Sequence, residues 1–110
     1  MQKRIQKIVQ VLDTNKAQDI ETFDLSEKDY FVDYAVIASS LGAKHTLALL
    51  EHLKKNLKPQ EHFNNVDESG EWIVVDLGDI LIHIMTPEYR TKYDMESFLT
   101  QLSSDESTQE

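Results

Sequence analysis

Apolar residues recur at helical spacing in three stretches of the chain, and these stretches predict three helices. The first helix ends near Asn15. The second follows a break at residues 39–42, where serine hydroxyls are available as caps, and stops at Pro59. The third spans residues 86–102, with Thr86 as N-cap and Pro87 at its first position. The expected buried stripes are Ile5, Ile8, Val9 and Leu12 in the first helix, Leu47, Leu50, Leu53 and Leu57 in the second, and Met95, Phe98, Leu99 and Leu102 in the third.

Alternating and continuous apolar runs predict four to five strands between these helices. Residues 19–25 alternate imperfectly, whereas residues 32–39 are rich in β-branched and aromatic side chains and predict a central strand. A short strand is expected at residues 62–66, and two more flank a turn in residues 71–85. The order α-β-β-α-β-β-β-α predicts an α/β domain, with a mixed β-sheet of four to five strands flanked by helices. Residues 1–102 would form this single domain, and residues 103–110, which include no apolar side chain, would be a disordered acidic tail.

The segment EWIVVDLGDILIHIM, residues 71–85, predicts a hairpin with two unlike faces. Its tight turn would have positive φ at Gly78 and Asp79. A mixed face that includes Trp and Met is typical of a partner-binding patch. Alternatively a helix covers that face and His83 hydrogen-bonds to Asp76, which the pattern by itself favours because exposed apolar patches are uncommon on small monomers. The apolar face holds Ile73, Val75 and Leu77 with Ile80, Ile82 and Ile84, and the mixed face holds Trp72, Val74 and Asp76 with Leu81, His83 and Met85.

Composition narrows the classes of function. The chain has 110 residues, no cysteine, and a formal net charge of −9 from twenty acidic and eleven basic side chains. The absence of cysteine excludes disulfides and thiolate metal sites and fits a reducing cytosol. An acidic chain is a poor binder of bare DNA or RNA and suits a basic protein partner better. No apolar run reaches membrane-spanning length, and MQKRIQKIVQVL at the start predicts a helix rather than a targeting signal.

An enzymatic interpretation would rely on Asp76 with Asp79, or on Asp76 with His83. Two carboxylates can hold a divalent cation for phosphoryl transfer. However, aspartate is also favoured at the turn position of Asp79 for backbone reasons, and the sequence has no Gly-rich phosphate loop. The four histidines, at positions 45, 52, 62 and 83, show no metal-ligand spacing, and those at 45 and 52 are expected to be solvated. Catalysis and metal binding are therefore not expected.

The segment WIVVDLGDILIHIMTPEYRTKYDME, residues 72–96, closely resembles the signature of the ribosomal silencing factor S family, also called the Iojap family. That signature combines a Trp that opens an apolar strand, an aspartate, a D-hydrophobic-G-D turn, a strand with a His, and a helix with R-x-x-Y and a following acid. Upstream, DYAVIASS and KAQDIETFDL are similar to two further family segments. The chain departs from the family pattern in the loop before the Trp, where Glu-Gly is usual. The matching residues are Trp72, Asp76, Leu77, Gly78, Asp79, His83, Arg90, Tyr93 and Glu96.

The resemblance implies a non-catalytic translation repressor whose fold is similar to nucleotidyltransferases without their active site. It further implies binding to the large ribosomal subunit, through its protein fourteen at the intersubunit face, and a block on joining of the small subunit when nutrients run short. We expect no cofactor and a cytoplasmic location. A homodimeric adaptor that pairs through the same face is the alternative. The expected partner-binding residues are Trp72, Asp76, Leu77, Gly78, Asp79, His83, Met85, Arg90 and Tyr93.

Overall fold

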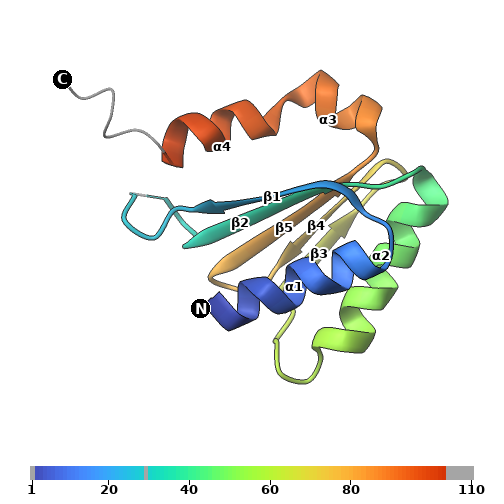
Figure 1. Ribbon diagram of the computed structural model, residues 1–110, viewed down its shortest axis with the longest axis horizontal. Coiled ribbons are helices and arrows are strands. Elements are labelled where there is room, and N and C mark those ends of the chain that lie inside the picture. Colours follow the sequence, from blue (N-terminus) through green and yellow to red (C-terminus); the bar gives the residue numbers. More distant parts are fainter. Residues whose placement is uncertain (1, 29, 104–110) are drawn as a thin grey trace.

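The computed structural model describes residues 2–28 and 30–103 and has the expected α/β architecture, a sheet with helices on both faces (Figure 1). The predicted last helix is two helices, because Asp94 takes a left-handed conformation with φ of 46° and ends the first of them. None of the helices in the described ranges is long and apolar enough to cross a membrane. The elements are α1 (Gln2–Thr14), β1 (Gln18–Asp24), β2 (Tyr34–Ser39), α2 (Ala43–Leu57), β3 (Asn65–Glu68), β4 (Trp72–Asp76), β5 (Ile80–Met85), α3 (Pro87–Tyr93) and α4 (Met95–Ser103).

The five strands form one mixed sheet in the order β1-β2-β5-β4-β3. Strands β2 and β5 are parallel, and every other neighbouring pair is antiparallel. The middle strand is β5, whereas β2, which we predicted to be central, is interior but lies one place toward the β1 edge. All six residues of β5 are buried, because helices cover both sides of the sheet.

The β4–β5 hairpin has the predicted register. Leu77 N donates to Ile80 O at 2.9 Å across a two-residue turn, and Trp72 faces Met85 at the open end. Gly78 has a φ of 99°, but Asp79 is not among the residues with positive φ. The turn therefore needs a positive φ only at Gly78. The expectation of positive φ at both positions was wrong for Asp79.

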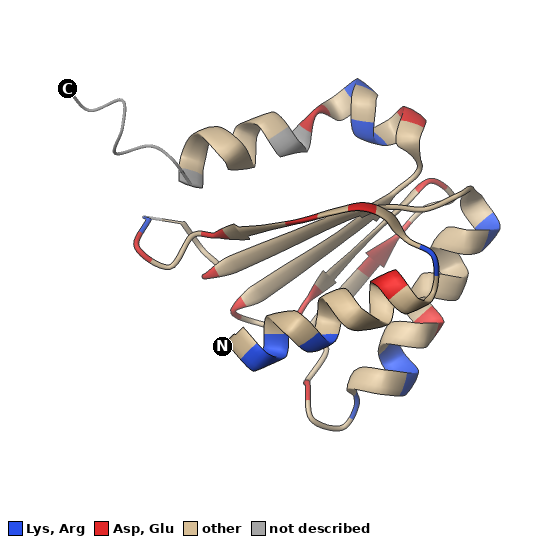
Figure 2. Ribbon diagram, viewed as in Figure 1, with Lys and Arg blue, Asp and Glu red and all other residues tan. Residues whose placement is uncertain are grey.

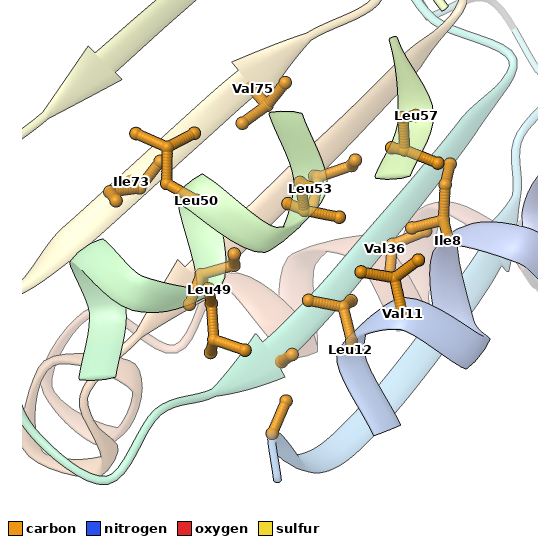
Figure 3. Close-up of a cluster of buried hydrophobic side chains, with 14 of the residues drawn as sticks. Ile8, Val11, Leu12, Val36, Leu49, Leu50, Leu53, Leu57, Ile73 and Val75 are labelled. Atoms are coloured by element: carbon orange, nitrogen blue, oxygen red, sulfur yellow. The ribbon is translucent and has the colours of Figure 1, made fainter. Parts of the chain in front are cut away.

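The larger core lies between α1, α2 and one face of the sheet (Figure 3). It includes all six residues of the predicted apolar hairpin face. In α2 the predicted stripe is wrong at Leu47, which is 48% exposed, and Leu49 is buried in its place. The hydroxyl cap is also wrong, because Gly42 is the N-cap residue and no side chain caps the helix. The buried hydroxyls of Ser40 and Thr46 instead hydrogen-bond to each other at 2.6 Å.

The smaller core lies on the other face, under α3 and α4. Leu99 is buried there and Leu102 packs at its margin, as predicted, but Phe98 is half exposed. The predicted burial of Met95 and the family match at Glu96 concern side chains outside the described residues. Helix α4 extends to Ser103, and residues 104–110 of the predicted tail also lie outside the described part, so the tail stays a prediction.

Candidate functional site

The mixed face of the hairpin forms the floor of a groove of about 300 Å³. Strand pairing sets Trp72 against Met85 and Val74 against His83, so these four side chains project from the same side of the sheet. Helix α3 supplies the remaining wall with two tyrosines. The lining residues, which we call the aromatic groove, are Trp72, Val74, His83, Met85, Tyr89 and Tyr93.

A short connection fixes α3 beside the strands. Thr86 follows β5 directly, and its N–H donates to Glu71 O at 3.0 Å, next to the start of β4. Its hydroxyl accepts from Tyr89 N at 3.3 Å, which is the predicted N-cap. The cap positions Tyr89 so that its ring lies 6.1 Å from the Trp72 ring, and Tyr93, one helical turn later, lies 4.4 Å from Tyr89. The result is a row of three aromatic rings that runs from the floor of the groove onto its helical wall.

The groove is open at its rim and closed at its floor. Tyr93 is 56% exposed, Trp72 and Tyr89 are half-buried, and Met85 at the base is buried. The helices thus cover part of the mixed face and leave its aromatic edge accessible. Partly exposed aromatic rings around a buried base are typical of a site that accommodates a partner's side chain.

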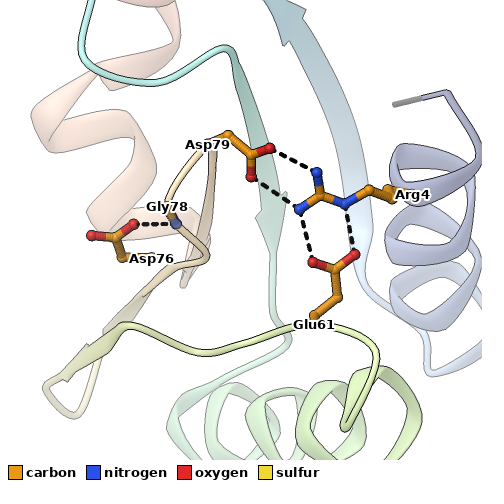
Figure 4. Close-up of polar contacts among 5 residues, drawn as sticks. All are labelled: Arg4, Glu61, Asp76, Gly78 and Asp79. Carbon is orange, nitrogen blue, oxygen red and sulfur yellow. Dashed lines mark hydrogen bonds and ion pairs between the residues drawn. The ribbon is translucent and has the colours of Figure 1, made fainter.

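His83 is 8% exposed, and its burial lowers its pKa to about 4, so the imidazole is neutral at physiological pH. The hydrogen bond proposed between His83 and Asp76 does not form. The Asp76 Oδ1 atom instead accepts from Gly78 N at 2.8 Å (Figure 4), and His83 pairs across the strands with Val74. In the groove His83 is therefore an uncharged part of the floor.

Four of the predicted binding residues lie at the other end of the hairpin. Asp76 is four residues from Trp72, about 13 Å along an extended strand. Leu77 is buried in the larger core and does not belong to the mixed face. Gly78 and Asp79 form the turn. These residues could contact a partner only as a second patch, separate from the aromatic groove.

Asp79 is bound within the protein by an arginine, a contact that the sequence did not predict (Figure 4). Arg4 of α1 donates to both Asp79 carboxylate oxygens, at 2.7 and 2.9 Å. It also donates two hydrogen bonds of 2.8 Å to Glu61. The hydrogen bonds from Arg4 hold the pKa of Asp79 below its usual value. Arg4 therefore ties α1 to the hairpin turn and to the segment after α2.

Arg90, also predicted to bind a partner, points away from the aromatic groove. Its side chain is buried, and Nη1 donates to Asp19 O at 2.8 Å and to Ser39 Oγ at 2.9 Å. Its Nη2 atom lies 3.6 Å from a carboxylate oxygen of Glu21. These contacts join α3 to β1 and β2, so Arg90 holds the tyrosine helix in place.

His45 is not simply solvated, contrary to expectation. Its Nδ1 atom accepts from Leu41 N, and its Nε2 atom lies 2.8 Å from Asn15 O, so the ring links α2 to the end of α1. Within residues 2–28 and 30–103 no group of three His, Cys, Asp or Glu side chains could hold a metal ion. Asp76 and Asp79, the proposed metal pair, instead hydrogen-bond to Gly78 and Arg4.

The sequence model of the family described as "Ribosomal silencing factor during starvation" matches residues 1–110. The chain belongs to this family. It is a family of regulatory proteins rather than enzymes, and the resemblance noted in the hairpin is thereby confirmed.

Relatives of this family differ in how much of their length the chain matches. The ribosomal silencing factor of Zymomonas mobilis is 33% identical over 88 residues, which cover 77% of this chain and 66% of that protein. A mouse protein named mitochondrial assembly of ribosomal large subunit protein 1 is 30% identical over 109 residues, 93% of this chain but 47% of its own. The chain thus spans about half to two thirds of these two relatives. A crystal structure of a Chromobacterium violaceum protein is 27% identical, with a TM-score of 0.83 over 90% of this chain and 85% of that one.

Proposed function

We propose that this protein binds the large ribosomal subunit through the aromatic groove and represses translation by preventing the small subunit from joining. The observation that carries the proposal is the row formed by Trp72, Tyr89 and Tyr93, partly exposed beside a buried base. Large aromatic residues around a desolvated centre are the usual hot spots of protein interfaces. Membership of the family and the name of the mouse relative support the large subunit as the partner.

Ribosomal protein fourteen is the proposed point of contact on that subunit. The net charge of −9 favours a basic protein partner, since complementary charge speeds and orients association. The groove itself is apolar and holds a neutral histidine, so it suits an apolar side chain of the partner.

The proposal is tested by sedimenting the protein with purified large subunits and, separately, with small subunits. Wild type should sediment with large subunits only and should lower the light-scattering signal of subunit joining. Trp72→Ala should weaken binding by about 2 kcal/mol or more, roughly thirtyfold, while the urea midpoint stays close to wild type. Phe31→Ala is the matched control, because Phe31 is an exposed aromatic residue outside the groove.

Tyr93→Ala keeps the test decisive if Trp72→Ala unfolds the protein, since Tyr93 is the most exposed ring of the groove. Folded variants of both residues that bind as tightly as wild type would refute the groove as the docking surface. Self-association of wild type that is lost in Trp72→Ala, without any sedimentation on large subunits, would support the homodimeric adaptor instead.

A further inference from the structure

A second groove lies on the opposite side of the sheet from the aromatic groove, between the start of α1 and the end of α2. It has a volume of about 550 Å³. Figure 2 shows basic segments on both helices at this end of the molecule. The residues that line this groove, which we call the basic groove, are Lys3, Arg4, Lys7, Lys55, Asn56, Leu57, Lys58, Gln60 and Glu61.

The charge of this groove is opposite to that of the chain. Its lining has five basic residues and one acidic residue, Glu61, whereas the whole sequence has eleven basic and twenty acidic side chains. Nearly half of all positive side chains therefore line one groove. On an acidic chain such a concentration produces a local positive field that the net charge conceals.

The groove's arginine is occupied by two carboxylates, whereas its lysines remain available. Arg4 binds Glu61 through two hydrogen bonds and shares its charge with Asp79. Lys3, Lys7 and Lys55 are exposed, and no ion pair of theirs occurs in the part of the chain that the structure describes. The Lys58 ammonium lies 5.1 Å from the Phe63 ring and likewise has no carboxylate partner there.

Helix stability favours Lys55 in the last turn of α2, but it does not account for the basic residues of α1. Lys3 and Arg4 lie in the first turn of α1, which contains no acidic residue. Positive side chains at a helix N-terminus are unfavourable because they meet the positive end of the helix dipole. Lys7 adds a like charge four residues after Lys3, which is also unfavourable. Side chains that lower helix stability in this way are expected at positions that serve binding.

We propose that the basic groove binds the phosphodiester backbone of RNA. A phosphate backbone requires only cations and hydrogen-bond donors, which the lysines and the amides of Asn56 and Gln60 provide. Acidic peptide motifs are typically bound by clusters of arginines, whereas the arginine of this groove, Arg4, is already bound to Glu61 and Asp79. Among the residues that the structure describes, no aromatic ring lines the groove for base stacking, so binding is independent of sequence.

The source of this RNA is the large ribosomal subunit, and in this respect the inference rests on the proposed function. Four lysines give weak affinity for free RNA, since the rest of the chain repels it. Once the aromatic groove is docked, the same contacts act at high effective concentration and add to the total affinity. The basic groove therefore contributes to binding on ribosomes more than its intrinsic affinity indicates.

The first experiment measures binding of a 20-nucleotide oligouridine across a salt series. We compare wild type with Lys7→Gln/Lys55→Gln and with the control Lys16→Gln/Lys44→Gln, which changes two exposed lysines outside the groove. Both variants change the net charge from −9 to −11. A plot of log K against log salt has a negative slope, and the loss of two phosphate contacts should make it shallower by about 1.4. Binding at low salt should become about tenfold weaker. The control should keep the wild-type slope.

Equal slopes for the two double variants, or no binding of oligouridine by wild type at low salt, would overturn the proposal. Tighter binding of a poly-glutamate peptide than of oligouridine would assign the groove to an acidic protein segment and would also overturn it. In the second experiment the Lys7/Lys55 variant should bind large subunits more weakly than the control and with a smaller salt dependence. Trp72→Ala should bind oligouridine with the wild-type salt dependence, because Trp72 lies outside the basic groove. The proposal for the aromatic groove and the proposal for the basic groove can therefore be refuted separately.

Discussion

Burial of His83 predicts a loss of stability in mild acid. The folded protein holds its imidazole neutral, with a pKa of about 4, whereas the unfolded chain takes up a proton near pH 6.5. The unfolded state therefore binds more protons between these values, and the free energy of unfolding falls as the pH drops from 6.5 toward 4. The two pKa values differ by about two and a half pH units, and each unit corresponds to about 1.4 kcal/mol. The free energy of unfolding should therefore fall by about 3 kcal/mol over this interval.

The assay is urea unfolding at several pH values between 7.5 and 4.5, with the single tryptophan as fluorophore. His83→Gln removes the titrating group, so the difference between wild type and variant should change by about 2–3 kcal/mol across this range. The matched control His62→Gln, at an exposed position, should follow wild type. Parallel pH profiles for wild type and His83→Gln would show that the imidazole is accessible to protons, and the groove floor would then not be buried as described.

Three further predictions concern stability and are checked by denaturant titration. Ile82→Ala removes a fully buried side chain in the middle strand and should cost about 2–5 kcal/mol, while a cost below about 1 kcal/mol would contradict its place in the core. Gly78→Ala should cost about 1–2 kcal/mol, because Gly78 has a φ of 99° and a new Cβ would lie 3.1 Å from Asn64 Nδ2. Arg4→Gln should lower the free energy of unfolding by about 1 kcal/mol at pH 7. The loss is small because Arg4 and Asp79 are both partly exposed to solvent. Because the Asp79 pKa is lowered, this difference should shrink as the pH falls below the usual pKa of an aspartate, and a difference that does not change with pH would contradict the ion pair.

The hairpin and most helix positions could be predicted because their signals are local. The turn register followed from two residues between alternating runs, and each hairpin face contained the residues expected. The Thr86 cap and Pro87 likewise marked the start of α3 correctly. The buried face of α2 was misplaced at Leu47 because its leucines are compatible with two neighbouring stripes. Only the position of the sheet decides between them.

The non-local features could not be derived from the pattern. Arg4 and Asp79 are 75 residues apart, and nothing near either one indicates the other. Residues of one sequence motif also lie in different places in the structure. Trp72 and Tyr93 line the aromatic groove, whereas Arg90 binds β1 and β2. Tyr89 was missed although its spacing of four residues from Tyr93 put both rings on one helix face. That spacing was the available signal.

The parallel pairing of β2 with β5 dictates when the sheet can close during synthesis. Residues 34–39 emerge first, but their partner strand at residues 80–85 is made only after α2, β3 and β4 have been translated. Until then β2 has β1 as its strand partner and α1 against one face, and closing the long connection to β5 costs chain entropy. The nascent chain therefore carries an open strand edge while residues 40–85 are translated, and an unpaired edge of this kind favours aggregation.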